Sequence, residues 1–204
     1  MKQIIPIFAL CIISFPFLLN AQNTSYEISA GISSALYKMD KHGTESSDLK
    51  IGFTGGFSLN FKTGNSWAIQ PGLYFVQKGG VETEMNINKK IYTTLNYIEL
   101  PVNMMYSKRG RFFFGFGPFG AYGFSGKIEI KDSIFVEKKI NFGHGTDDLK
   151  PFDAGINVVM GYRFPSGVFF SLNIVPSVNN LSNNDPYYFS NGYIGIKAGY
   201  LFSD

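Results

Sequence analysis

Large apolar residues alternate with small or polar residues along most of the chain that follows residue 25. In the segment 191–202, one face of an extended chain would carry Ile194, Ile196, Ala198, Tyr200 and Phe202. The other face would carry Gly195, Lys197, Gly199 and Leu201. A period of two residues is that of a β-strand whose faces meet different surroundings. Comparable segments predict eight strands, at about residues 26–37, 49–62, 66–79, 92–107, 111–125, 152–164, 167–178 and 191–202.

The connections between these segments alternate between short and long. The short ones are 62–65, 108–110 and 165–167, and the long ones are 38–48, 80–91, 126–151 and 179–190. Bacterial outer-membrane barrels have an even number of antiparallel strands, tight periplasmic turns and larger outer loops. The pattern therefore predicts an all-β, eight-stranded antiparallel up-and-down transmembrane β-barrel with both termini in the periplasm.

The segment before the first predicted strand has the features of a secretory signal peptide. Lys2 gives it a positive start, an apolar stretch follows, and the small Ala21 precedes polar residues. Pro6 and Pro16 interrupt the apolar stretch, which argues against a membrane helix. We therefore expect a cleaved signal peptide at 1–21 and a single barrel domain at 22–204.

Composition supports export to a membrane. Charged residues make up 16% of the chain, against about a quarter in a typical soluble domain, and aromatic residues make up 17%. A soluble ligand-carrying barrel would expose more charge to water. The formal net charge is +3, and the sequence has no run of basic residues, so no nucleic-acid partner is expected. The only cysteine, Cys11, would leave with the leader, so the mature chain would have no thiol.

Aromatic residues of the apolar face cluster beside the short connections and the C-terminus. In a membrane barrel such side chains form a ring at the level of the lipid headgroups. The predicted periplasmic girdle consists of Phe61, Trp67, Tyr106, Phe112, Phe164, Tyr200 and Phe202.

The opposite face carries most of the charged residues of the predicted strands. The inward set is Glu27, Lys50, Gln70, Lys78, Glu99, Asn103, Arg111, Asp153, Asn157, Arg163 and Lys197. Side chains fill the interior of an eight-stranded barrel, and buried charges need partners. We expect a structural polar network of Glu27, Glu99, Arg111, Asp153, Arg163 and Lys197. In it Glu99 would meet Lys197 near mid-height, and Glu27, Arg111 and Arg163 would lie nearer the periplasm. The alternative is a conducting polar path.

Several segments resemble a small bacterial outer-membrane β-barrel family, commonly labelled porin family or PorT-like. The segments 70–79 (QPGLYFVQKG), 95–102 (LNYIELPV) and 114–120 (FGFGPFG) are similar to its third, fourth and fifth strands, and 152–155 and 195–202 fit later ones. The resemblance spans essentially the whole mature chain and implies the outer membrane of a Gram-negative bacterium. It also implies two partners, outer-membrane lipid and the barrel insertion machinery. Members often end on an aromatic residue that this machinery recognises, which assigns a C-terminal insertion signal to Tyr200 and Phe202, although Ser203 and Asp204 follow here.

Chemistry-bearing residues give no pattern of an active site. Both histidines, His42 and His144, fall in predicted outer loops, and neither has a serine at a recognisable nucleophile spacing. His144 with Asp147, Asp148 and Asp153 fits no metal-loop template. The sequence therefore assigns no catalytic residue, no cofactor and no metal site.

Three functions fit the sequence to different degrees. The first is a non-enzymatic barrel with a side-chain-filled lumen and a structural or surface-interaction role through its outer loops, whose ligand or protein partner is unknown. The second is a small porin-like channel for ions or solutes. The third is a lipid-modifying barrel enzyme, which would need reactive groups near one rim.

Overall fold

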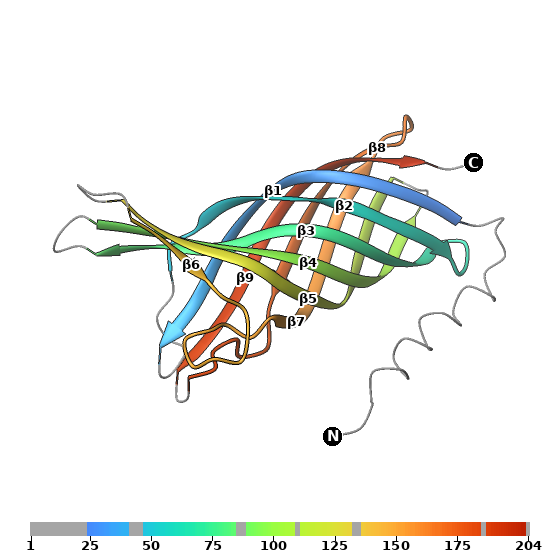
Figure 1. Ribbon diagram of the computed structural model, residues 1–204. Coiled ribbons are helices and arrows are strands. Elements are labelled where there is room, and N and C mark those ends of the chain that lie inside the picture. The colour runs from blue at the N-terminus through green and yellow to red at the C-terminus, as the bar shows by residue number, and fades with distance from the viewer. Residues whose placement is uncertain are drawn as a thin grey trace, which may run out of the picture.

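The computed structural model describes residues 24–40, 47–84, 89–108, 111–131, 136–184 and 187–202. The expected signal peptide lies outside these residues. Within them the chain forms nine β-strands (Figure 1). These are β1 (Thr24–Asp40), β2 (Lys50–Lys62), β3 (Trp67–Glu84), β4 (Lys89–Lys108), β5 (Phe112–Lys131), β6 (Val136–Ile140), β7 (Phe152–Arg163), β8 (Val168–Pro176) and β9 (Tyr188–Phe202). No helix in the described ranges is long and apolar enough to span a membrane.

Eight of the nine strands close into a barrel. Antiparallel pairing runs in the order β4-β3-β2-β1-β9-β8-β7-β5, and β4 pairs with β5 to complete the ring. Each strand of the ring therefore has a neighbour on both sides, as a barrel in lipid requires. The predicted eight-stranded antiparallel up-and-down barrel is confirmed.

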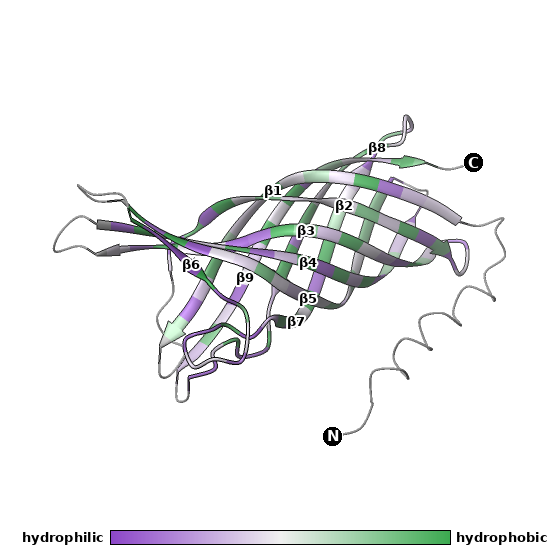
Figure 2. Ribbon diagram, viewed as in Figure 1, coloured by the Kyte–Doolittle hydropathy of each residue, from purple (hydrophilic) through white to green (hydrophobic). Residues whose placement is uncertain are grey.

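The strands alternate between buried and exposed residues as the two-residue period predicts. On β9, Ile194 and Ile196 are about half exposed, whereas Tyr193 and Lys197, which flank them, are buried. The exposed apolar side chains recur on every strand of the ring, and hydrophobic residues alternate with others along the barrel (Figure 2). So large an apolar exterior is far beyond what a monomer exposes to water, and it indicates a lipid-facing surface.

The two ends of the barrel differ. β1 begins and β9 ends at the same end (Figure 1). The short β2–β3 and β7–β8 turns, the end of β4 and the start of β5 lie there too. We call it the turn end and the opposite one the loop end. At the loop end β3, β4 and β5 continue past the other strands as a projecting sheet.

The short strand β6 extends this projecting sheet. It pairs antiparallel with β5 from Gly126 to Ile130, within the stretch 126–151 that the sequence predicts as a long connection. The Lys127 ammonium bonds Glu129 and Glu137, 2.9 and 3.3 Å away, and these hydrogen bonds raise the pKa of Lys127. Hydrophilic residues are frequent in this part of the sheet (Figure 2).

Candidate functional site in the barrel lumen

A first polar cluster lies in the lumen toward the turn end. Arg163 Nη2 donates to Glu27 Oε1 at 2.5 Å, and Gln70 Nε2 donates to Glu27 Oε2 at 3.0 Å. Gln70 Nε2 also reaches Asn60 Oδ1 at 2.9 Å. These residues come from four strands, β1, β2, β3 and β7, because inward positions at the same height meet across a narrow barrel.

A second cluster lies toward the loop end and is centred on Lys78. Its Nζ is 3.0 Å from Asp153 Oδ2 and 3.1 Å from Glu99 Oε2, and all three side chains are at most 2% exposed. The other Glu99 oxygen accepts a hydrogen bond from the Tyr193 hydroxyl at 2.8 Å. Ser177 Oγ donates to Asp153 Oδ2 at 2.9 Å. A cation shared by two carboxylates ties β3, β4 and β7 together in the interior.

Aromatic rings surround the buried ammonium groups. Lys78 Nζ lies 4.6 Å from the centre of the Phe119 ring and 5.0 Å from that of Tyr97. Lys197 Nζ lies over the Tyr74 ring, 4.1 Å from its centre. Contacts of this kind stabilise a desolvated cation by about 2 kcal/mol. The rings therefore replace part of the solvation that water would give these ammonium groups outside the lumen.

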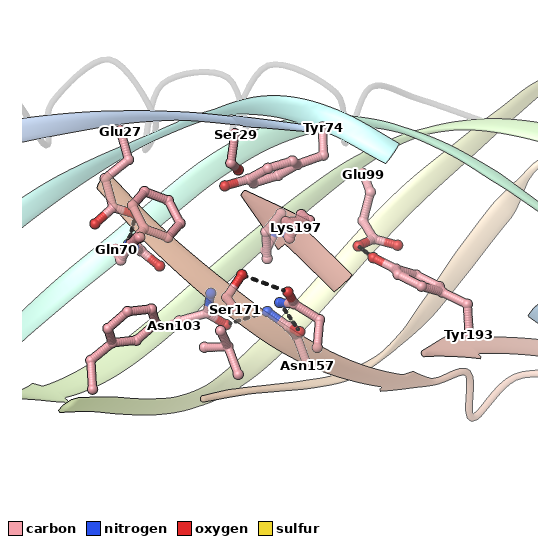
Figure 3. A pocket seen from close by; sticks show the side chains of 15 residues that line it. Glu27, Ser29, Gln70, Tyr74, Glu99, Asn103, Asn157, Ser171, Tyr193 and Lys197 are labelled. Carbon is pink, nitrogen blue, oxygen red and sulfur yellow. Dashed lines mark hydrogen bonds between the residues drawn. The ribbon is translucent and has the colours of Figure 1, made fainter. Parts of the chain in front are cut away.

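Between the two clusters the lumen is filled by amides. Asn157 Nδ2 donates to Asn103 Oδ1 at 2.9 Å, and Asn173 Nδ2 donates to Asn157 Oδ1 at 3.3 Å (Figure 3). The cavity enclosed there has a water-accessible volume of about 20 Å³, and Lys197 points into it from β9. Such a volume holds about one water molecule. The charges of the lumen residues described above are equal in number. The three cations are Lys78, Arg163 and Lys197, and the three carboxylates are Glu27, Glu99 and Asp153.

An apolar cap covers the lumen at the loop end. Tyr97 and Leu181 are fully buried there, and the Phe142 ring packs edge-on against Tyr97 at 5.6 Å. Asn183 Nδ2 donates to the carbonyls of Gly143 and Asp148, at 2.9 and 3.0 Å, and so joins the two long loops that build the cap. The lumen is therefore closed twice, by paired charges and by packed side chains.

The sequence of residues 20–183 matches the family described as Outer membrane protein beta-barrel domain. The chain belongs to this family. The match covers most of the chain, and it confirms the resemblance to a small outer-membrane β-barrel family. No curated protein matches the chain in sequence.

Solved structures of other small outer-membrane proteins have a similar fold. The attachment invasion locus protein Ail of Yersinia pestis is 14% identical, with a TM-score of 0.49 over 88% of this chain and 99% of its own. Neisserial surface protein A is 11% identical, with a TM-score of 0.42 over 88% and 99%. The outer membrane protease OmpT of Escherichia coli is 11% identical, with a TM-score of 0.38 over 93% and 99%. At these values none of them carries an argument about activity.

Two expectations for the lumen of this outer-membrane barrel were wrong. Glu99 pairs with Lys78 and Tyr193 rather than with Lys197. Arg111 lies in the turn before β5 with its side chain exposed, and its carbonyl accepts a hydrogen bond from the Arg163 backbone at 2.8 Å. Arg111 precedes the first residue of β5, Phe112, so the alternation of the strand does not extend to it.

The structure also brings in residues that charge alone did not single out. Phe113 and Phe119 interrupt the alternation on β5 with aromatic residues at inward positions, and both are buried. The Arg163 guanidinium lies 5.3 Å from the centre of the Phe113 ring and 6.0 Å from that of Phe169. The signal was present in the sequence, because an aromatic residue on the polar face of a barrel strand must pack inside.

The predicted girdle residues lie on the outer surface near the turn end. Phe112 is 73% exposed, and the Trp67 and Tyr106 rings are 4.9 Å apart. Tyr200 packs edge-on against Phe202 at 4.7 Å, and Phe202 stacks on Tyr26 at 4.7 Å. The remaining two members, Phe61 and Phe164, occupy outward positions next to the short turns.

Reactive groups are sparse in the lumen. Among the described residues, no three side chains of His, Cys, Asp or Glu lie close enough together to hold a metal ion. His144 lies in a loop outside the barrel strands. The Asp148 carboxylate accepts a hydrogen bond from the Gly145 backbone at 3.1 Å. Asp153 is buried and paired with Lys78. His42 falls outside the described residues.

Proposed function

We propose that this protein is a closed, non-enzymatic outer-membrane barrel with a structural or surface-interaction role carried by its loop end. The observation that supports this most directly is the filled lumen. Lys78 and Arg163 are paired with carboxylates, Lys197 lies against the Tyr74 ring, and the cavity has room for about one water molecule. The barrel strands contain no histidine, and this absence from the sequence supports a non-enzymatic role. Rigid barrels position loops for recognition, and here the projecting sheet and the cap form that surface.

The turn end faces the periplasm in this proposal. The short turns lie there, together with the first and last described residues and the predicted aromatic girdle. Bacterial outer-membrane barrels have this arrangement at their periplasmic end. A leader cleaved after Ala21 would deliver the chain to the periplasm of a Gram-negative cell. Tyr200 and Phe202, at the end of β9, would then meet the insertion machinery from that side, and lipid would surround the apolar band.

Refolded wild-type protein is expected to give no discrete conductance steps in planar bilayers. The reason is that an ion would have to break the Lys78 and Arg163 ion pairs and pass the apolar cap. Heat-modifiable gel mobility of the same sample checks that the silent protein is a folded barrel. Steps whose frequency rises with the amount of folded protein would contradict the closed-barrel proposal and favour the small channel.

Cysteine labelling tests which end faces the cell exterior. Lys139→Cys in β6 and Asn65→Cys in the β2–β3 turn both replace exposed residues, and the only native cysteine lies in the expected leader. A membrane-impermeant maleimide is expected to label Lys139→Cys on intact cells, and Asn65→Cys only after the outer membrane is permeabilised. The opposite pattern would place the loops in the periplasm and reject the proposed orientation.

A further inference from the structure

A second, larger cavity opens at the turn end and is separate from the lumen cavity. It has a volume of about 370 Å³ and is formed by the β2–β3 turn together with the ends of β4, β5, β7 and β9. We call it the vestibule. Its size lies within the range of small-molecule sites, and the filled lumen closes it on the inner side. A molecule that enters the vestibule therefore stops there.

The charged residues that line the vestibule among the described residues are Lys62 and Arg163, both cations. Arg163 is held in place, because Nη2 is bound to Glu27 and its guanidinium faces Phe113 and Phe169. Glu27 is 5% exposed and is not part of the lining. Since Glu27 offsets Arg163, the Lys62 charge is left over, and it matches one negative charge on a ligand.

The rest of the lining combines apolar and polar residues. Its inward apolar residues are Ala68, Met105, Phe113 and Leu201, from β3, β4, β5 and β9, and its polar residues include Ser25, Asn60 and Ser107. A site for an amphipathic small molecule needs apolar side chains close to a polar or charged group, and the vestibule has both. The cations and the apolar residues thus define a head position and a tail position.

We propose that the vestibule binds a small amphipathic monocarboxylate, such as a medium-chain fatty acid. Its carboxylate lies between Lys62 and Arg163, where the guanidinium offers a planar set of N–H donors to an anion. Its alkyl chain packs against Met105, Phe113 and Leu201. This function is independent of conductance, because the ligand binds at the mouth and does not cross the barrel.

The single tryptophan of the chain makes the proposal directly measurable. Trp67 borders the vestibule next to Ala68, and its ring packs against Tyr106 on the outer surface. Its fluorescence therefore reports a ligand at the vestibule as well as probe in the surrounding detergent, and the neutral bromo-alcohol separates the two. Refolded barrel in a zwitterionic detergent is titrated with 8-bromooctanoate, whose bromine quenches tryptophan on contact. We expect saturable quenching that unbrominated octanoate reverses, and much weaker, non-saturable quenching by the neutral 8-bromooctanol.

Two matched lysine variants separate a site from general attraction to a basic barrel end. Lys62→Gln removes the unpaired cation of the vestibule, whereas Lys108→Gln removes an exposed cation at the same end that does not line it. We expect at least a fivefold rise in the apparent dissociation constant for Lys62→Gln and less than a twofold change for Lys108→Gln. Both sites are exposed, and heat-modifiable mobility verifies folding of each variant.

Three results would overturn the proposal. Equal quenching by the bromo-acid and the bromo-alcohol would mean that the probe only partitions into the detergent around the aromatic girdle. Equal weakening in both lysine variants would mean a diffuse charge effect. Displacement of the bromo-acid by inorganic phosphate as effectively as by octanoate would mean a simple anion site without a place for the alkyl chain.

Discussion

Replacing Lys78 by methionine is expected to lower the free energy of unfolding by about 3–5 kcal/mol. Lys78 is fully buried, and its ammonium lies 3.0 Å from Asp153 and 3.1 Å from Glu99. The variant keeps most of the side-chain volume but leaves two carboxylates without a cation in a site that water does not reach. Removing one partner of a buried ion pair is more damaging than replacing the whole group, because the remaining charge is uncompensated.

The control is a triple variant, Lys78→Met with Glu99→Gln and Asp153→Asn. It removes all three charges at nearly constant volume, so it is expected to recover more than half of the stability lost in Lys78→Met. Denaturant titration of the barrel in lipid vesicles, followed by the fluorescence of Trp67, measures both. A triple variant as unstable as Lys78→Met would show that packing around Lys78, rather than charge pairing, holds this part of the lumen together.

The architecture of this barrel was predictable because each strand carries its own evidence. Alternation on 191–202 assigns Ile194 and Ile196 to lipid and Lys197 to the interior without reference to any other strand. Burial on the neighbouring β1 follows the same rule independently, with Glu27 inside and Ile28 outside. The predictions for the eight strands are consistent with one another. The alternation of short and long connections then favours an up-and-down order of the strands around the barrel.

Partner choice inside the lumen was not predictable from the same pattern. The alternation predicts that Glu99, Lys78 and Lys197 point inward. It does not predict the height of each along the barrel axis, because that height depends on strand tilt and register around the whole ring. Lys78 and Asp153 are 75 residues apart in the chain and on strands that are not neighbours in the sheet. A sequence read strand by strand contains no information about that contact.

The asparagines of the last long loop have roles that composition does not predict. The side chains of Asn179, Asn180 and Asn183 form hydrogen bonds with backbone groups. Asn180 Oδ1 accepts from the backbone of Phe189, and Asn179 Oδ1 accepts from that of Ala154, at 2.9 and 3.0 Å. Amide side chains satisfy backbone groups as readily as they satisfy water, so composition alone does not distinguish the two roles.

Replacing Gly117 by alanine is the second change with a large expected effect, a loss of about 1–3 kcal/mol of unfolding free energy. Gly117 lies on β5 with its missing side chain directed at β4. A Cβ atom added there would lie 1.9 Å from the Val102 carbonyl oxygen and 2.8 Å from the Asn103 Cα. Both are backbone atoms within a paired strand, so relief requires a shift of the β4–β5 contact itself.

Gly120, three residues further along β5, provides the matched control. A Cβ there would meet only the Phe152 ring, at 3.6 Å, which is ordinary contact. Gly120→Ala is therefore expected to change the unfolding free energy by no more than about 0.5 kcal/mol, as substitutions without a steric consequence do. Both variants add the same methyl group to the same strand, so a strand-wide effect of replacing glycine cancels between them. Equal losses in the two would mean that backbone freedom rather than close strand approach explains the glycines of β5, and equal stability would mean that β4 and β5 separate at Val102 without cost.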